Sequence, residues 1–178
     1  MLSRVPIGDR VPEVVNTIVE IPKGLSNKYE YDEVLEVIRL DRVLFSPVYY
    51  PTDYGFIPQT RSPDGDHLDI LVLISQPTFP GCVLEVAPVG ILDMRDQAGR
   101  DSKIIGVAVR DTRVADMRTI HDVNDHTRRE IQHFFETYKH LEGKSVTVGG
   151  WLDREEAHRT IIESWERFRA ETPGRGSR

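Results

Sequence analysis

The sequence predicts a single α+β domain, because strand-like segments come first and helical periodicity appears only near the end of the 178 residues. The strand-like segments are short, apolar and separated by Gly, Pro and Asp turns. They cover residues 14–21, 28–32, 34–40, 68–74, 82–92 and 103–109, with 144–151 as a further candidate. This order of elements fits a small closed barrel covered by two helices.

Two amphipathic helices are predicted in the last third of the chain. In the first, which should begin near Asn124 or Asp125, apolar residues recur at spacings of three and four. These residues are Ile131, Phe134, Phe135, Tyr138 and Leu141. Asp153, with Glu156 three residues later, is typical of a helix start and predicts the second helix. The domain is expected to span 1–178, with an N-terminal arm at 1–13 and a flexible tail at 171–178.

The acidic composition limits the function. A net charge of −6 argues against a nucleic-acid or membrane-surface binder, which normally presents a basic face. The N-terminus has no apolar signal region and no segment approaches the roughly 20 apolar residues of a membrane span, so a cytoplasmic location is expected. An acidic protein that binds an anion must concentrate its cations locally or recruit a metal ion.

The most informative segment carries three carboxylates, Asp64, Asp66 and Asp69, where a glycine turn enters an apolar strand. Crowded carboxylates raise the electrostatic energy unless positive charge lies among them. Taken alone, the Asp-Gly-Asp segment is better explained as a solvated acidic turn. A calcium-binding EF-hand loop does not fit, because Asp69 and Ser75 would occupy the positions of its glycine and glutamate.

A second acidic pair, Asp96 and Asp101, flanks Gly99, which permits a tight turn. Lys103 follows Asp101 by two residues, so both side chains lie on one face of an extended strand. Taken alone, this pattern is better explained as an ordinary charged hairpin. The other candidate clusters are Glu20, Lys28 with Glu30, Arg42, the aromatic loop Tyr50–Phe56, and Tyr138 with Lys139. Each has a simple structural alternative, such as a cross-strand ion pair or core packing.

Together, these motifs resemble a known family. In order and spacing, E-I-P, K-Y-E, D-R, Y-P-x-x-Y-G, D-G-D-x-x-D, D-x-x-G-x-D-x-K and F-F-E-x-Y-K resemble the soluble family I inorganic pyrophosphatases of the short bacterial type. The resemblance extends from about residue 14 to about residue 168. It implies hydrolysis of pyrophosphate on an OB-like five-stranded closed β-barrel with two packed helices, assembled as a homohexamer.

The resemblance also implies roles for individual residues. Asp66 is the implied general base. The implied metal ligands are Asp64, Asp69, Asp96, Asp101, Glu20 and Glu30, and the implied substrate-binding residues are Lys28, Arg42, Tyr54, Lys103, Tyr138 and Lys139. Carboxylate oxygens suit Mg²⁺, so several Mg²⁺ ions per subunit are expected, with Mn²⁺ or Zn²⁺ as substitutes.

Three residues depart from the family pattern: His67, Asp53 and Arg100. His67 is expected to be a solvated loop residue, and Arg100 adds positive charge beside Asp101. Two other functions remain open. An OB-like barrel could bind oligonucleotides, which the acidic charge disfavours. A catalytically silent metal-binding or scaffold protein would bind metal without releasing phosphate.

Overall fold

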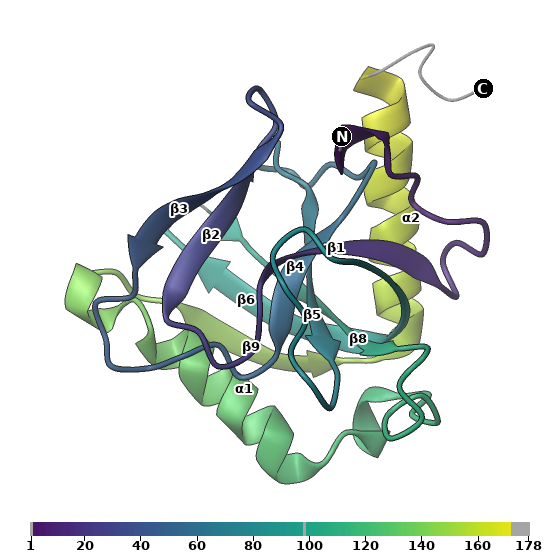
Figure 1. The fold of residues 1–178 in the computed structure, drawn as a ribbon. Coiled ribbons are helices and arrows are strands. Elements are labelled where there is room, and N and C mark those ends of the chain that lie inside the picture. The colour runs from purple at the N-terminus through teal and green to yellow at the C-terminus, as the bar shows by residue number, and fades with distance from the viewer. Residues whose placement is uncertain (1, 98, 172–178) are drawn as a thin grey trace.

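The computed structural model describes residues 2–97 and 99–171 and confirms a small α+β fold with two long helices (Figure 1). The strands are β1 (Val15–Ile21), β2 (Asn27–Asp32), β3 (Val37–Val43), β4 (Asp53–Ile57), β5 (Leu68–Leu73), β6 (Val83–Asp96), β7 (Gly99–Arg100), β8 (Lys103–Ala108) and β9 (Thr147–Leu152). The helices are α1 (Asp125–Thr137) and α2 (Arg154–Glu171), with short 3₁₀ helices η1 (Leu2–Arg4), η2 (Ile120–Asp122) and η3 (His140–Glu142). Residues 172–178 of the expected tail lie outside the described residues.

The strand pairings follow a ring. Neighbours pair in the order β1, β4, β5, β8 and β6, and β6 pairs in turn with β1. All of these pairs are antiparallel except β5 with β8, where Ile70 lies opposite Ile104. The 14-residue β6 also pairs with β7 and β9. A separate two-stranded sheet, β2 with β3, stands beside the ring (Figure 1).

Strand β4 overlaps residues 50–56, which the sequence predicts to be an aromatic loop. Its Gly55 pairs with Val19 of β1. A Cβ atom at Gly55 would lie 2.8 Å from the Cα of Val19 and still nearer to the carbonyl oxygen of Ile18. Only glycine therefore lets β1 and β4 approach this closely.

Apolar side chains on the two faces of the strands form two clusters. In β5, Leu71 packs in one cluster with Phe135 of α1, and Ile70 packs in the other with Ile161 of α2. Successive side chains of β5 therefore point to opposite faces, as expected for a strand that is buried on both faces. The two helices thus cover different parts of the sheet (Figure 1).

Both predicted helix starts are confirmed. The Asn124 side chain accepts a hydrogen bond from the backbone N–H of His126 at 2.8 Å, and the Asp153 side chain accepts one from Glu156 at 3.2 Å. The prediction that Leu141 lies on the first helix is wrong. Helix α1 ends earlier, and Leu141 is in η3 with 65% of its surface exposed, because the chain tightens into a 3₁₀ turn there.

Asp53, one of the departures from the family pattern, is fully buried. Its carboxylate accepts hydrogen bonds from the backbone N–H groups of Lys23 and Thr78, at 2.8 and 3.0 Å, and from the Thr78 hydroxyl at 2.7 Å. These donors satisfy the buried charge. Asp53 therefore joins three chain segments and contributes to the fold.

The expected N-terminal arm contacts the ring. Ile7 is buried in the same cluster as Ile161, and its backbone bonds to Gln59 and Asn16. Within residues 2–97 and 99–171, no helix combines the length and apolar character needed to cross a membrane.

Candidate active site

A cavity of about 570 Å³ is walled by β2, by the loop between β4 and β5, and by the turn between β6 and β8. Every predicted site residue except Arg42 lines it. The carboxylates are Glu20, Glu30, Asp64, Asp66, Asp69, Asp96 and Asp101, and the other predicted residues are Lys28, Tyr54, Lys103, Tyr138 and Lys139. Side chains from five separate stretches of sequence therefore share one space.

The first acidic motif forms a tight turn, which we call the acidic loop (residues 61–67). Gly65 adopts a φ of +95°, a conformation that favours glycine. The backbone N–H of Ser62 donates to the carbonyl of Asp66 at 2.8 Å, and the N–H of Asp66 donates to the Asp64 carboxylate at 3.1 Å. Asp69 follows on β5, so the loop and the strand together present three carboxylates to the cavity.

Lys103 lies between two of the carboxylates. Since β5 and β8 are parallel with Ile70 opposite Ile104, Asp69 and Lys103 start their strands side by side. The buried Nζ of Lys103 is 2.5 Å from oxygens of both Asp69 and Asp101. Burial alone would lower the pKa of Lys103, but Asp69 and Asp101 together raise it. The ammonium group therefore stays charged.

Three carboxylates of the cavity have raised pKa values. Burial, aided by Asp69, raises the pKa of Glu20 to about 8. Partial burial, with the charges of Asp64 and Asp69, raises the pKa of Asp66. Burial also raises the pKa of Asp101, against the opposing effect of Lys103. Such shifts show that an added cation would stabilise the ionised carboxylates.

The chemistry of the cavity fits a hard divalent cation, since its acidic side chains offer carboxylate oxygens. In the described part of the chain, no three acidic, histidine or cysteine side chains are gathered tightly enough to enclose an ion. Lys103 occupies the space between Asp69 and Asp101.

Lys28 and Arg42 are placed differently, although they pair across β2 and β3. Lys28 enters the cavity and forms ion pairs with Glu30 and, at 3.2 Å, with Asp41. Arg42 pairs with Asp41 and with Glu142, whose carboxylate is 2.9 Å from its Nη2 atom. The guanidinium group of Arg42 thus stands beside the cavity instead of lining it.

Two tyrosines supply hydroxyl groups to the cavity. Burial raises the pKa values of both Tyr54 and Tyr138, so their hydroxyls stay protonated and can donate hydrogen bonds. The Nζ of Lys139 is 3.5 Å from the Asp96 carboxylate and 5.3 Å from the ring centre of Tyr138. Lys139 and the two hydroxyls therefore offer the cavity a positive charge and hydrogen-bond donors.

The prediction that His67 is a solvated loop residue is wrong. Its ring stacks on Phe56 with centroids 4.7 Å apart, and its Nδ1–H donates to the Thr60 carbonyl at 3.0 Å. Burial lowers the pKa of His67. Arg100, expected beside Asp101, instead donates to Asp93 at 3.0 Å.

Two cavity residues, Glu33 and Arg61, were missed by sequence reasoning. Neither belongs to a motif with a recognisable spacing. Their positions depend on how the β2–β3 hairpin meets the acidic loop, which only the fold determines.

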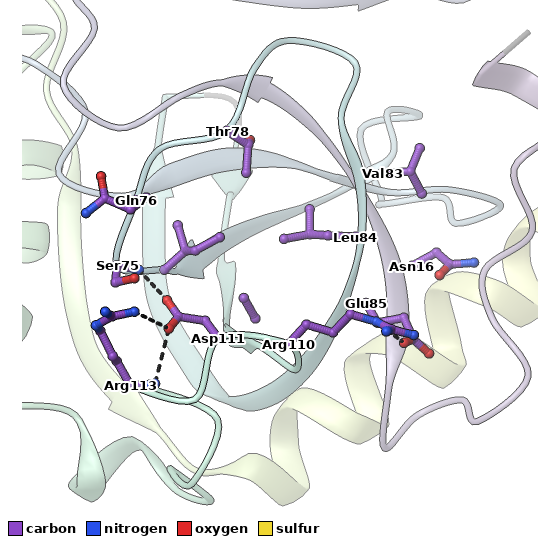
Figure 2. A pocket seen from close by; sticks show the side chains of 12 residues that line it. Asn16, Ser75, Gln76, Thr78, Val83, Leu84, Glu85, Arg110, Asp111 and Arg113 are labelled. Carbon is purple, nitrogen blue, oxygen red and sulfur yellow. Dashed lines mark hydrogen bonds and ion pairs between the residues drawn. The ribbon is translucent and has the colours of Figure 1, made fainter.

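A second, larger cavity of about 670 Å³ contains no predicted site residue (Figure 2). Its two carboxylates each face an arginine: Glu85 lies 3.7 Å from Arg110, and Asp111 lies 3.9 Å from Arg113. Asp111 also accepts a hydrogen bond from the backbone N–H of Ser75 at 2.6 Å. The charges in this larger cavity are balanced. The smaller cavity is therefore the better candidate for a catalytic centre.

The fold and the smaller cavity define a class of protein. Clustered carboxylates suit divalent cations, and lysines with tyrosine hydroxyls suit phosphate oxygens. Both sets meet in one cavity, which is the arrangement of a metal-dependent hydrolase acting on a phosphate compound.

Comparison with known proteins identifies the family. The family model described as inorganic pyrophosphatase matches residues 17–169. The inorganic pyrophosphatase of Methanosarcina mazei is 53% identical over 156 residues, which cover 88% of this chain and 92% of the relative. That of Streptomyces coelicolor is 51% identical over 152 residues, covering 85% and 93%. The crystal structure of the Thermus thermophilus enzyme superposes with a TM-score of 0.92 at 49% identity, covering 94% of this chain and 98% of that one.

The chain belongs to the inorganic pyrophosphatase family, which confirms the resemblance seen in the motifs. It is therefore an enzyme that hydrolyses pyrophosphate, and the family is metal-dependent.

Proposed function

We propose that the protein hydrolyses pyrophosphate to two orthophosphates by attack of a water molecule whose proton passes to Asp66. One observation carries this proposal: carboxylates from two distant segments, 64–69 and 96–101, line the same cavity as three lysines. The raised pKa of Asp66 suits a proton acceptor, since an ordinary Asp is a weaker base.

The proposed cofactor is Mg²⁺, several ions per subunit, with Mn²⁺ or Zn²⁺ as substitutes. The proposed ligands are Asp64, Asp69, Asp96, Asp101, Glu20 and Glu30. When bound, the ions would neutralise these carboxylates, lower the pKa of a water molecule and polarise the substrate.

The chain's own residues then account for the remaining steps. The water oxygen forms a bond to one phosphorus while Asp66 accepts its proton. The bond from that phosphorus to the bridging oxygen breaks, and the bridging oxygen leaves with the second phosphate. Lys28, Lys103 and Lys139, with the hydroxyls of Tyr54 and Tyr138, bind the phosphate oxygens and compensate the charge that develops on the leaving group.

Phosphate release from pyrophosphate tests the metal requirement. With Mg²⁺ present, the protein is expected to release two phosphates per pyrophosphate. An excess of chelator should abolish turnover, because the carboxylates would again repel one another and no polarising cation would remain. Added Mg²⁺ should restore it. Full turnover under chelation would contradict the proposed cofactor.

Replacing Lys139 with Ala is expected to raise KM by about tenfold, since one charge-assisted contact to phosphate is lost. Steady-state kinetics provide the measurement. Lys23→Ala is a matched control, because Lys23 is exposed and does not line the cavity. Unchanged KM and kcat in Lys139→Ala would remove Lys139 from the phosphate site.

Further features remain proposals. Arg42 would assist phosphate binding from beside the cavity, where Glu142 orients its guanidinium group. The ring of strand pairings supports an OB-like closed five-stranded barrel, and one pyrophosphatase domain would span the chain. A homohexamer, a cytoplasmic location and no binding to nucleic acid or membranes complete the expectations from the sequence.

A further inference from the structure

Glu33 and Arg61 connect two walls of the active-site cavity. Glu33 directly follows β2, in the turn of the β2–β3 hairpin, and Arg61 begins the acidic loop. The Nη1 and Nη2 atoms of Arg61 donate to the two carboxylate oxygens of Glu33 at 2.8 and 3.1 Å. This two-point geometry fixes the relative orientation of both groups.

The same guanidinium group reaches the turn that carries the catalytic carboxylates. The Nη1 of Arg61 also donates to the carbonyl oxygen of Gly65 at 3.1 Å, between Asp64 and Asp66. The Oε1 atom of Glu33 also lies 2.9 Å from the Nε2 atom of His67, a contact that becomes an ion pair only when the imidazole is protonated. Glu33 thus contacts residues on both sides of the turn.

Arg61 is itself anchored to helix α2. Its backbone N–H donates to the carbonyl of Ser164 at 2.9 Å, and its backbone carbonyl accepts a hydrogen bond from Arg167. Its Nε atom is 3.3 Å from the Glu171 carboxylate, and its guanidinium carbon is 5.8 Å from the ring centre of Phe168. Helix α2 therefore fixes Arg61 at the start of the acidic loop, and the Arg61 side chain holds the turn at residues 64–66.

We propose that Glu33 and Arg61 are positioning residues that hold the acidic loop against the β2–β3 hairpin and so keep Asp66 in place for proton transfer. The inference rests on the role of Asp66 proposed above. This positioning role explains why Glu33 and Arg61, which lie outside the catalytic motifs, line the cavity.

The β2–β3 hairpin is also held by contacts that do not involve Glu33. The acidic loop is therefore the segment whose position depends on the Glu33–Arg61 contact. The backbone N–H of Tyr31 donates to Glu20 at 2.7 Å, and the Tyr31 ring stacks on Phe56. The residues of the turn, Asp64–Asp66, are exposed, and apart from the Arg61 contact their hydrogen bonds in the described part of the chain are to other residues of the loop. Replacing Glu33 should therefore loosen the acidic loop, whereas Lys28 and Glu30 on the hairpin should keep their positions.

The side chain of Glu33 is 45% exposed, and such ion pairs contribute little to global stability. Its removal should leave the thermal unfolding temperature nearly unchanged. The effect should appear in kcat, because a small displacement of a catalytic group slows the chemical step more than it weakens substrate binding.

Steady-state kinetics and amide hydrogen exchange on the full-length enzyme with Mg²⁺ test the proposal. Glu33→Ala is expected to lower kcat about tenfold with KM changed less than about twofold. Exchange of the backbone amides of Ser62 and of residues 64–67 should accelerate. Arg61→Ala should lower kcat at least as much, because it also removes the contact with the Gly65 carbonyl, and the double variant should lose little more than Arg61→Ala alone. Glu33→Gln, which retains acceptor atoms, should fall between Glu33→Ala and wild type.

Glu85→Ala is the matched control. It removes another Glu–Arg pair, with Arg10 at 3.0 Å, which lies outside the active-site cavity. Its kcat and loop exchange should match wild type. Wild-type kcat in Glu33→Ala, or a lower unfolding temperature with kcat unchanged, would overturn the positioning role. Full activity in Asp66→Asn would instead contradict the proposed base, and the exchange of the loop amides would still decide whether Glu33 holds the loop.

Discussion

Replacing Asp66 with Asn is expected to lower kcat by about 10²–10⁴-fold, the usual contribution of a positioned general base. The amide cannot accept the proton that the carboxylate accepts, yet it has nearly the same volume. Asp66 is exposed and its backbone makes the bonds that close the acidic loop, so the fold should be retained. Phosphate release at saturating Mg²⁺–pyrophosphate measures the loss, and circular dichroism checks the fold.

The matched control for this variant is Asp116→Asn. Asp116 is an exposed carboxylate that does not line the active-site cavity. It should retain wild-type kcat, which separates the loss of a particular base from a general loss of negative charge. If Asp66→Asn turned over pyrophosphate as fast as the Asp116 variant, another group would have to accept the proton.

Replacing Gly55 with Ala is expected to destabilise the protein by about 3 kcal/mol, which corresponds to a drop in Tm of roughly 10 °C. The new methyl group would meet the backbone of β1, whose Val19 Cα would be 2.8 Å away. Backbone atoms in a paired strand cannot move aside as a side chain can. Thermal or urea unfolding followed by circular dichroism provides the measurement.

Gly143→Ala separates this steric effect from backbone strain. Gly143 has a φ of +69°, but a Cβ atom there would meet nothing within 4 Å. Its replacement should lower the free energy of unfolding by about 1 kcal/mol, which is the penalty of a left-handed conformation alone. Equal losses in the two variants would mean that the contact between β1 and β4 tolerates a methyl group.

The sequence predicted the strands with strong apolar runs and both helix starts, because these signals are local. It did not predict β4, since Pro51 and Gly55 are typical of a loop. In the fold, Pro51 precedes the strand and Gly55 is needed for close strand contact. The Leu141 error has a similar origin: helical spacing continues past α1 in the sequence, but the backbone tightens into η3.

The candidate site was predicted to the extent that its residues belong to motifs, and nearly all of these line one cavity. Contacts between motifs could not be predicted. The buried position of Lys103 between Asp69 and Asp101 depends on the parallel pairing of β5 and β8. The Glu33–Arg61 contact depends on the meeting of a hairpin and a loop, and the stacking of His67 on Phe56 depends on the pairing of β4 with β5.

The parallel pairing of β5 with β8 also has a consequence for folding. Two strands that run in the same direction cannot be joined by a short turn, and here the long β6 lies between them in the chain. Contacts between residues this far apart form late, because the intervening chain must first lose its freedom. We therefore expect Asp69 and Lys103 to meet after the local helices and hairpins have formed, so that a partly folded chain would still lack the paired charges of the active-site cavity.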